Sequence, residues 1–221
     1  MIASPASAPN SMPVSQATPM LQLDNVTVQR GEIPLCEEVM LDLATGNICH
    51  LIGANGTGKT TLLMQLAGLL PILTGEVAYQ GIAGLPVQPL YVSHQLGINP
   101  SLTVAQNLKF LLNLYGISPT AAEIDEALAW VGLQGFEMLS SNHLSAGQTR
   151  RITLARLYLL TPKVTPLWLL DEPFTALDVD MVARMEDRLR AFVNSGGAII
   201  MTSHQPVGVA NQVLDLSDYM V

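Results

Sequence analysis

The sequence predicts an α/β fold in which short antiparallel strands come first and a helical insert interrupts a core of buried strands. Three observations predict this fold. Short apolar runs, typical of buried strands, occur on both sides of the insert at residues 48–52, 167–170 and 198–202. From about residue 101 to 160 the apolar spacing becomes helical instead. A glycine-rich loop joins the first buried run to a further helix.

The N-terminal residues 1–19 are expected to form a disordered tail. They combine Ser, Ala, Gln and Asn with four prolines, which break any helix. A transit peptide is the alternative, and the lack of Arg and Lys in this segment disfavours it. We expect one domain over residues 20–221, with a helical subdomain at about 98–160.

Composition limits the classes of partner. With 221 residues, of which 49% are hydrophobic, the chain can fill one substantial core. A net charge of −8 disfavours a nucleic-acid partner. No apolar stretch approaches the roughly 18 residues of a membrane span, so we expect that the chain does not cross a bilayer by itself. Cys36 and Cys49 lack disulfide or metal spacing and are expected to be buried free thiols.

The remaining elements follow from periodicity and turn residues. Antiparallel strands are expected at residues 21–23, 26–28 and 39–43, before a turn at 45–47, and further strands at 75–79 and 90–93. Helices are expected over residues 104–115 and 121–131, because their leucine, isoleucine and valine side chains fall on one face. In order along the chain, these elements give a core sheet interrupted by a helical subdomain.

The glycine-rich loop has the spacing G-x-x-x-x-G-K-T, and its residues are Gly53, Ala54, Asn55, Gly56, Thr57, Gly58, Lys59, Thr60 and Thr61. Glycines let the backbone approach a polyphosphate closely with its N–H groups aimed inward. The helix expected at 59–66 would direct its positive end at the phosphates, while Lys59 reaches the β and γ oxygens and Thr60 ligates Mg²⁺. The loop therefore predicts a nucleoside triphosphate site; a glycine-rich turn with a chance Lys-Thr is the alternative.

Two carboxylates follow the buried run at 167–170. Asp171 and Glu172 stand at the carboxyl end of a strand, where ligands of open α/β sheets gather. Asp171 suits the binding of Mg²⁺, directly or through water, and Glu172 suits the polarisation of a water that attacks the γ-phosphate. A solvated acidic turn before Pro173 is the alternative, which the phosphate loop makes less favourable.

A helix opens at Leu144-Ser145-Ala146-Gly147-Gln148, with Ser145 suited to be its N-cap. This segment resembles the signature motif of ATP-binding cassette (ABC) ATPases. Other motifs occur in that family's order: Gln95 matches the glutamine loop, residues 175–178 match the D-loop, and His204 matches the switch histidine. The resemblance covers residues 21–205 and implies a P-loop NTPase fold with a RecA-like core sheet, an antiparallel β sheet and an inserted helical subdomain.

The resemblance also implies an ATP hydrolase whose cofactors are ATP and Mg²⁺. In this family two cassettes pack head to tail, so the signature of one chain caps the γ-phosphate bound by the other. The residues of this chain implied to contact nucleotide across that interface are Ser145, Gly147, Gln148 and Asp178. Gln95 would act both in catalysis and as a Mg²⁺ ligand, and His204 would position the water together with Glu172.

Some residues depart from the family pattern or suggest only structural roles. The family often stacks an aromatic side chain on adenine; residues 28–31 hold none, and Arg30 is the expected substitute, with a solvated arginine as the alternative. Ala146 occupies a position where glycine is common. His50 and His94 are interpreted as packing or hydrogen-bonding groups. Met181 and Met185, one helical turn apart, are interpreted as core residues.

Within the family, several segments resemble the ATP-binding subunits of haem exporters that serve cytochrome c maturation. These segments are residues 93–99, 101–108, 144–151, 170–178 and 203–206. Since only residues 205–221 follow His204, we expect a bare cassette without a regulatory domain. The resemblance implies a peripheral subunit at the cytoplasmic face of the inner membrane, a homodimer, a separate integral-membrane subunit, and haem or a related component as cargo.

Two alternatives remain open at this point. The chain could power another small-substrate ABC exporter, or it could be a soluble ABC ATPase that acts as a switch on the ribosome or DNA. The second alternative usually needs two cassettes or long coiled-coil insertions and a more basic surface, which this sequence lacks.

Overall fold

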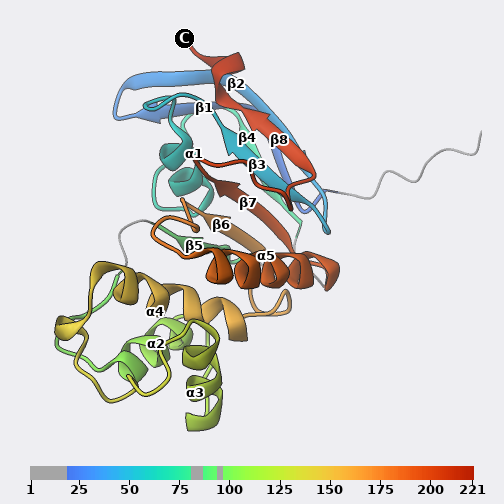
Figure 1. Cartoon of the computed structure of the whole chain (residues 1–221). Coiled ribbons are helices and arrows are strands. Elements are labelled where there is room, and N and C mark those ends of the chain that lie inside the picture. Colours follow the sequence, from blue (N-terminus) through green and yellow to red (C-terminus); the bar gives the residue numbers. More distant parts are fainter. Residues whose placement is uncertain (1–18, 81–86, 94–96) are drawn as a thin grey trace, which may run out of the picture.

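The computed structural model describes residues 19–80, 87–93 and 97–221. The predicted tail at 1–19 therefore lies almost entirely outside the described residues, as do His94 and Gln95. Two sheets form the body of the molecule (Figure 1). A three-stranded antiparallel sheet has the order β2-β1-β4, and a five-stranded sheet has the order β5-β6-β7-β3-β8 with every neighbouring pair parallel.

The antiparallel sheet contains β1 (Leu21–Arg30), β2 (Ile33–Leu43) and β4 (Glu76–Tyr79). The parallel sheet contains β3 (Ile48–Ile52), β5 (Leu90–Val92), β6 (Leu167–Leu170), β7 (Ala198–Thr202) and β8 (Gln212–Asp215). The helices are α1 (Lys59–Leu66), α2 (Val104–Asn113), α3 (Ala121–Trp130), α4 (Ala146–Leu159) and α5 (Val179–Asn194). Short 3-10 turns cover Ser141–His143 and Leu216–Tyr219. The predicted α/β fold is confirmed.

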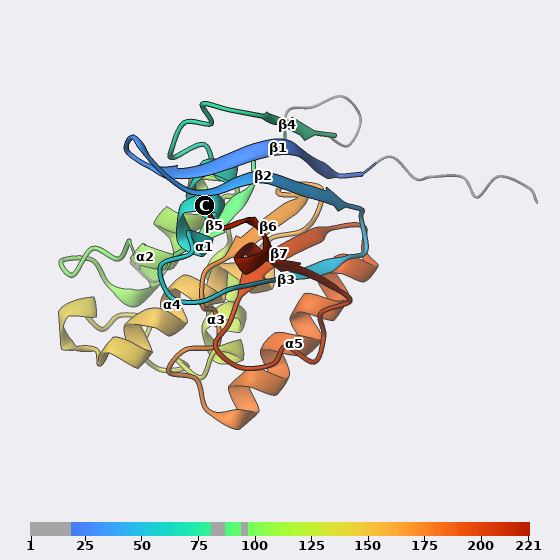
Figure 2. The same ribbon diagram turned by 90° about the horizontal axis from the view of Figure 1, so that it is seen from above.

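The parallel sheet separates two cores, because its strands are buried on both faces. Leu167 and Leu169 of β6 face a core shared with α1 and the antiparallel sheet, whereas Trp168 and Leu170 face a core shared with α2 to α5. Figures 1 and 2 show α1 between the two sheets, and α2, α3 and α4 gathered at the end of the molecule far from the antiparallel sheet. A continuously apolar strand such as β6 is what a position between two cores requires.

Several predicted boundaries differ by one or two residues, and those of β1 and β2 were wrong by more. The expected strands 21–23 and 26–28 are one strand, β1, because the irregularity at Asn25, with φ of 51°, shifts the register with β2 without ending the pairing. The expected strand 39–43 begins earlier, at Ile33, since residues from Ile33 onward pair with the end of β1. Helix α5 and strand β8 were not predicted at all.

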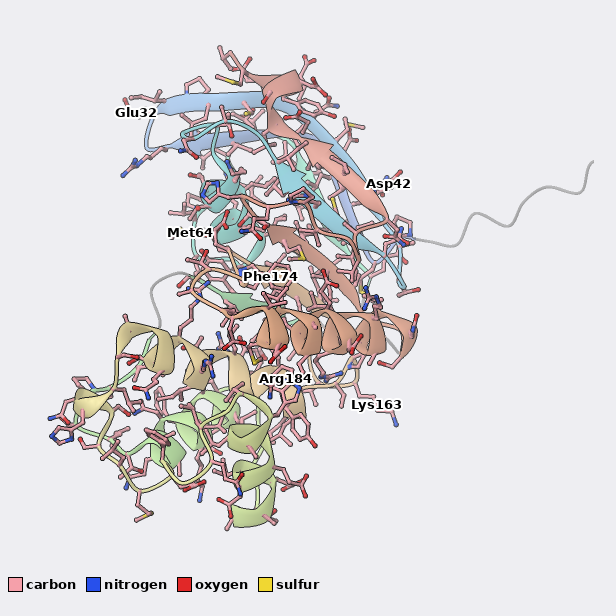
Figure 3. All side chains as sticks on the ribbon, in the orientation of Figure 1. Glu32, Asp42, Met64, Lys163, Phe174 and Arg184 are labelled. Atoms are coloured by element: carbon pink, nitrogen blue, oxygen red, sulfur yellow. The ribbon has the colours of Figure 1, made fainter. Side chains whose placement is uncertain are left out.

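Arginines of α5 attach the helical insert to the parallel sheet. Arg184, labelled in Figure 3, donates its Nη1 hydrogen to the carbonyl of Trp130 at the end of α3, over 2.7 Å. Arg188, one turn later, donates to the carbonyls of Leu157 and Leu160 at the end of α4. Cations at helix C-termini satisfy otherwise unpaired carbonyls and oppose the helix dipole. Within residues 19–80, 87–93 and 97–221, no helix combines the length and apolar character of a membrane span.

Candidate active site

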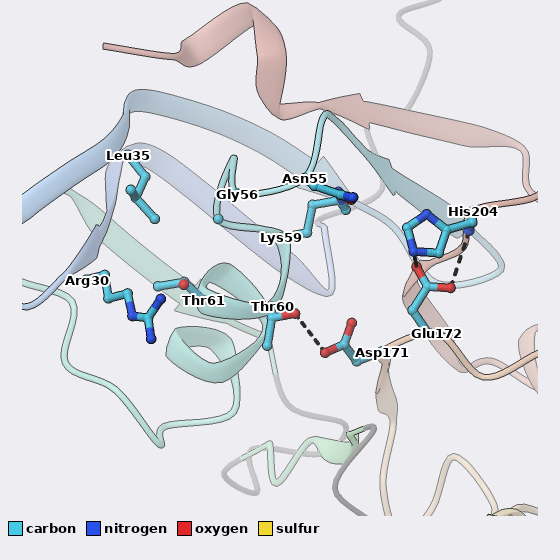
Figure 4. A pocket seen from close by; sticks show the side chains of 11 residues that line it. Arg30, Leu35, Asn55, Gly56, Lys59, Thr60, Thr61, Asp171, Glu172 and His204 are labelled. Carbon is cyan, nitrogen blue, oxygen red and sulfur yellow. Dashed lines mark hydrogen bonds and ion pairs between the residues drawn. The ribbon is translucent and has the colours of Figure 1, made fainter. Parts of the chain in front are cut away.

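Three adjacent parallel strands end at one edge of the sheet and deliver the candidate site. β3 leads into the glycine-rich loop, β6 leads into Asp171 and Glu172, and β7 leads to His204. An open pocket of about 320 Å³ lies at this edge (Figure 4). Its described lining residues are Arg30, Leu35, Asn55, Gly56, Gly58, Lys59, Thr60, Thr61, Asp171, Glu172 and His204.

The glycine-rich loop needs its glycines at specific places. Gly53, Gly56 and Gly58 have φ values of 142°, 90° and 101°, a region that disfavours side chains. An added Cβ would lie 2.7 Å from Thr57 Oγ1 at Gly53 and 2.8 Å from Val28 Cγ1 at Gly58. Gly58 also caps α1 without a side-chain hydrogen bond, so no side chain of the cap competes with a phosphate for the first N–H groups of the helix.

The ammonium of Lys59 lies over this loop. Its Nζ donates to the carbonyls of Gly53 and Ala54, over 2.7 and 3.0 Å. Thr57, predicted with the loop as a nucleotide contact, has its side chain turned inward: it is 2% exposed, and its hydroxyl donates to the Ala54 carbonyl over 3.0 Å, so only its backbone is available to a nucleotide. Of the loop, the side chains that line the pocket are therefore those of Asn55, Lys59 and the threonines that follow Lys59.

Two of the three residues predicted to hold Mg²⁺, Thr60 and Asp171, lie together, and the third, Gln95, lies outside the described residues. The Thr60 hydroxyl donates to Asp171 Oδ2 over 2.9 Å (Figure 4), and the Thr202 hydroxyl donates to Asp171 Oδ1 over 2.8 Å. The described residues hold no cluster of three or more His, Cys, Asp or Glu side chains that could bind a metal by themselves. One hydroxyl and one carboxylate beside a pocket fit Mg²⁺, which proteins usually bind through few carboxylates together with substrate phosphates.

Glu172 and His204 also meet, although 32 positions separate them. Glu172 Oε2 accepts the backbone N–H of His204 over 3.3 Å, and Oε1 lies 3.7 Å from His204 Nε2. The His204 side chain is 70% exposed and the Glu172 side chain 21%, so both are accessible from the pocket. Glu172 has φ of 53°, and its own N–H donates to the Thr202 hydroxyl over 2.8 Å.

The signature segment forms the N-terminus of α4, away from this pocket. Ser145 caps the helix in a capping box: its hydroxyl accepts the N–H of Gln148 over 3.2 Å, and Gln148 Oε1 accepts the N–H of Ser145 over 2.9 Å. Ala146 is the first helical residue, so its methyl group fits. Ser145, Gly147 and Gln148 are not among the described residues that line the pocket.

Asp178 likewise lies outside the pocket, at the N-cap of α5. Its carboxylate accepts the Met181 N–H over 2.8 Å and forms an ion pair with Arg151 of α4. The hydrogen bond from Met181, followed by the contact with Arg151, lowers the pKa of Asp178. One chain therefore supplies the glycine-rich loop to this pocket, while its signature and D-loop segments lie outside the pocket.

The remaining predictions have mixed outcomes. Arg30 lines the pocket, on the side opposite His204 in Figure 4, together with Leu35, which the sequence analysis missed. Gln95 lies outside the described residues. Cys36 and Cys49 are buried free thiols, and Met181 and Met185 are fully buried, as expected. His50 Nε2 lies 3.3 Å from the Ser203 carbonyl, which agrees with a hydrogen-bonding role.

Two further residues that contact Glu172 were also missed. Thr202 and Arg150 bind the backbone of Glu172, and Thr202 also binds Asp171. Their positions in the sequence could have indicated both residues. Thr202 ends the strand that precedes His204, and Arg150 follows the signature segment by two residues.

Comparison with known proteins agrees with this geometry. Residues 36–175 match the family model described as ABC transporter. A protein of Saccharophagus degradans named cytochrome c biogenesis ATP-binding export protein CcmA is 38% identical over 208 residues, which cover 88% of this chain and 92% of that protein. The protein of the same name from Escherichia coli (strain K12) is 42% identical over 197 residues, which cover 86% of this chain and 92% of the relative.

A solved structure extends the comparison. It is the dimer of an ATP-binding cassette in a post-hydrolysis state, bound to ADP and Pi. It aligns with a TM-score of 0.74 at 25% identity and covers 89% of this chain and 94% of its own. The family model covers more than half of the residues, and the predicted phosphate loop and acidic strand end form one pocket. This chain therefore belongs to the ABC transporter family and is one of its ATP-hydrolysing cassettes.

Proposed function

We propose that this chain powers the export of haem or a related component for cytochrome c biogenesis. The observation that carries this proposal is its 38% to 42% identity to cytochrome c biogenesis ATP-binding export proteins, over 92% of their length. In this role the chain is a peripheral subunit at the cytoplasmic face of the inner membrane. A separate integral-membrane subunit provides the path for the cargo.

Nucleotide binding is assigned to the glycine-rich loop and its neighbours. The backbone of Gly53, Ala54, Asn55, Gly56, Thr57 and Gly58, with the side chains of Lys59 and Thr61, holds the phosphates. Thr60 and Asp171, joined by a 2.9 Å hydrogen bond, would hold Mg²⁺, with Gln95 as a further ligand. When bound, Mg²⁺ neutralises charge on the β and γ oxygens. Arg30 and Leu35, at the far side of the pocket, are suited to contact the adenine ring.

Hydrolysis is assigned to Glu172, His204 and Gln95. The Glu172 carboxylate accepts a hydrogen bond from the attacking water, which increases its nucleophilicity. His204, whose ring lies 3.7 Å from that carboxylate, hydrogen-bonds the γ-phosphate and fixes the line of attack. The exposure of the imidazole leaves it free to meet a phosphate at this edge of the pocket.

A second copy of the chain completes each site. Ser145, Gly147 and Gln148 lie at the positive N-terminus of α4, away from their own pocket, and are assigned to the γ-phosphate bound by the other copy. Asp178 lies at the same interface. A triphosphate held between two helix N-termini gains stabilisation that ADP lacks, so hydrolysis would weaken the dimer. The resulting cycle of closing and opening can drive a membrane subunit.

Affinity purification from membranes tests this proposal. The tagged chain is purified after detergent solubilisation, and its partners are identified. We expect an integral-membrane subunit and, in cells that carry only Glu172→Gln, a loss of assembled c-type cytochromes. Asp187→Asn, at a surface position whose side chain is 79% exposed, is the control and should leave cytochrome assembly intact. Recovery of ribosomes or DNA without a membrane subunit would favour the switch function, whereas intact cytochromes with Glu172→Gln would favour another cargo.

A further inference from the structure

Arg150 connects the signature helix of this chain to its own catalytic centre. It lies one helical turn after Ala146, the first residue of α4, and is 6% exposed. Its Nη2 donates to the backbone carbonyl of Glu172. The signature residues at the start of α4 are not among the described residues that line the pocket, so Arg150 is a direct link from this helix to the backbone that carries the Glu172 carboxylate.

The backbone of Glu172 is restrained from both sides. Its N–H donates to the Thr202 hydroxyl over 2.8 Å, while its carbonyl accepts from Arg150 and from the Thr175 N–H, the latter over 3.2 Å. Glu172 needs such restraint, because its φ of 53° is unusual for a residue with a side chain. Backbone in this region persists only where the surrounding structure fixes it. The direction of the Glu172 carboxylate thus depends on these contacts.

Burial of the charged Arg150 side chain costs desolvation free energy, although the side chain binds a single carbonyl. Burial lowers the pKa of Arg150, and the negative charges of Asp171 and Glu172 oppose this effect. Its Nε is buried without a hydrogen-bond partner among the described residues. A neutral donor could satisfy the same carbonyl at a lower desolvation cost. The position of a charged group beside the two acidic residues of the site suggests a role in the reaction rather than in folding alone.

We propose that Arg150 is a positioning residue that orients Glu172 according to the placement of the signature helix in the same chain. When Ser145, Gly147 and Gln148 engage the nucleotide of the partner copy, α4 shifts, and Arg150 transmits that shift to the Glu172 of its own site. Each site therefore hydrolyses ATP fastest when its chain has also engaged the other nucleotide. This inference rests on the proposed roles of Glu172 and of the signature segment.

Steady-state ATPase kinetics of Arg150→Gln tests the positioning role. We expect kcat to fall about tenfold with a nearly unchanged KM, because a misplaced carboxylate affects the transition state more than ATP binding. Arg150→Lys, which retains a charged donor, should recover part of the kcat. Arg156→Gln is the matched control: Arg156 is also 6% exposed, also belongs to α4, and donates Nη2 to the Tyr91 carbonyl over 3.0 Å. It should lower the melting temperature as much and leave kcat near native.

Mixed dimers test the direction of the effect. One copy carries Glu172→Gln, so only the site with the intact Glu172 of the other copy can hydrolyse ATP. Arg150→Gln is then placed on either copy. When Arg150→Gln is on the chain with the intact Glu172, turnover should fall about tenfold. When Arg150→Gln is on the chain that carries Glu172→Gln, whose signature faces the active site, turnover should stay near that of the control. A loss only in the second arrangement would mean that Arg150 acts through the signature, and equal losses would mean that it acts on both sites alike; either result would overturn the inference.

The outcomes separate this inference from the proposed function. Native turnover with Glu172→Gln alone would remove the catalytic role of Glu172 and the inference together. If Glu172→Gln abolishes turnover but Arg150→Gln retains the native kcat, the proposed site stands and only the inference fails. A loss of kcat that merely follows the loss of melting temperature, equal in Arg150→Gln and Arg156→Gln, would assign Arg150 to folding and also contradict it.

Discussion

Lys59 and Glu172 line the same pocket but should affect different kinetic constants. Glu172→Gln removes the carboxylate that is proposed to polarise water and keeps the shape of the side chain, so we expect ATP binding to remain while turnover falls at least about 100-fold. Lys59→Ala removes a cation placed over the phosphate loop, and it should weaken ATP binding itself. Nucleotide titration by calorimetry and phosphate release measure the two effects separately.

Both variants need a check that the loop and the sheet edge are intact. Glu172 Oε2 accepts the His204 N–H, a bond that a glutamine oxygen can also accept, so the fold of Glu172→Gln should match that of the native chain. Unchanged melting temperature without nucleotide provides the control. Native turnover with Glu172→Gln, or native affinity with Lys59→Ala, would contradict the respective role.

Motif spacing predicted most of the residues that line the pocket. The residues that hold the backbone of Glu172 could not be predicted in this way. The spacing around Lys59 and the two acids after β6 contained enough information because each motif is local in sequence. Thr202 and Arg150 act on Glu172 from 30 and 22 positions away. Such contacts depend on how β7 and α4 pack against the end of β6, and a single sequence does not encode this packing as a local pattern.

The role of Ser145 in the signature segment can be tested by comparison with a similar helix cap, Thr120. Ser145 caps α4 and Thr120 caps α3, each in a capping box with the residue three positions later. Because both hydroxyls satisfy an N–H at the start of a helix, Ser145→Ala and Thr120→Ala should each cost about 1 kcal/mol of unfolding free energy. Only Ser145→Ala should also lower ATP turnover, since only Ser145 is assigned to a γ-phosphate. Urea unfolding and phosphate release provide the two measurements.

The pair of capping variants distinguishes a structural from a functional serine. Equal turnover in both variants would mean that Ser145 serves α4 alone. If Ser145→Ala lost more stability than Thr120→Ala, part of its loss of turnover would come from unfolding. Activity is therefore compared at urea concentrations well below both unfolding midpoints.

A buried thiol on the interior strand β3 makes stability sensitive to alkaline pH. Burial raises the pKa of Cys49 from 9.0 to about 12, although a hydrogen bond with the Leu214 backbone opposes the shift. Above pH 9 the unfolded chain loses this proton while the folded chain keeps it, so the stability present below pH 9 is lost as pH rises toward 12. One such group lowers the unfolding free energy by about 1.4 kcal/mol per pH unit in this interval.

Cys49→Ala isolates this contribution from those of other groups. Burial also raises the pKa values of Tyr79 and Tyr91 to about 12, so the native chain loses stability through several groups at once. We expect the unfolding free energy of Cys49→Ala to fall less steeply between pH 9 and 10.5 than that of the native chain. Equal slopes in urea unfolding, or rapid maleimide labelling of folded Cys49, would show that the thiol is accessible.

Elements with strong local patterns could be predicted, and those defined by pairing could not. The apolar runs of β3, β6 and β7 and the helix after the phosphate loop have the predicted bounds. β8 is four residues long, has a mixed pattern, and exists because it pairs with β3 at the sheet edge. α5 buries Met181 and Met185 along one face, a spacing that was recognised without being extended to a helix. β1 remains continuous because pairing with β2 overrides the local turn at Asn25.

In the whole molecule, the two groups of residues assigned to nucleotide binding lie at different places on the same chain. Its pocket contains the phosphate loop, the acids and His204, whereas the signature and Asp178 lie outside this pocket, at the N-termini of α4 and α5. Gly147 illustrates the separation, since a Cβ added there would meet only the Ala176 carbonyl, at 3.8 Å. A side chain at this position thus costs the chain itself little. An aspartate in the first turn of α4 would even favour the helix dipole, yet it would repel a γ-phosphate presented by a second copy.

Complementation between two inactive variants follows from this arrangement. Lys59→Ala weakens ATP binding by the loop of its own chain. Gly147→Asp blocks contact between its own signature and the nucleotide bound by the partner chain. In a mixed head-to-tail dimer, both defects fall in one site and the other site is intact. Random mixing should therefore raise turnover above that of either variant alone, to at most roughly a quarter of the native value, because about half of the dimers are mixed and each has one good site. Activity that stays at the level of either variant alone would mean that each chain builds its site without a partner.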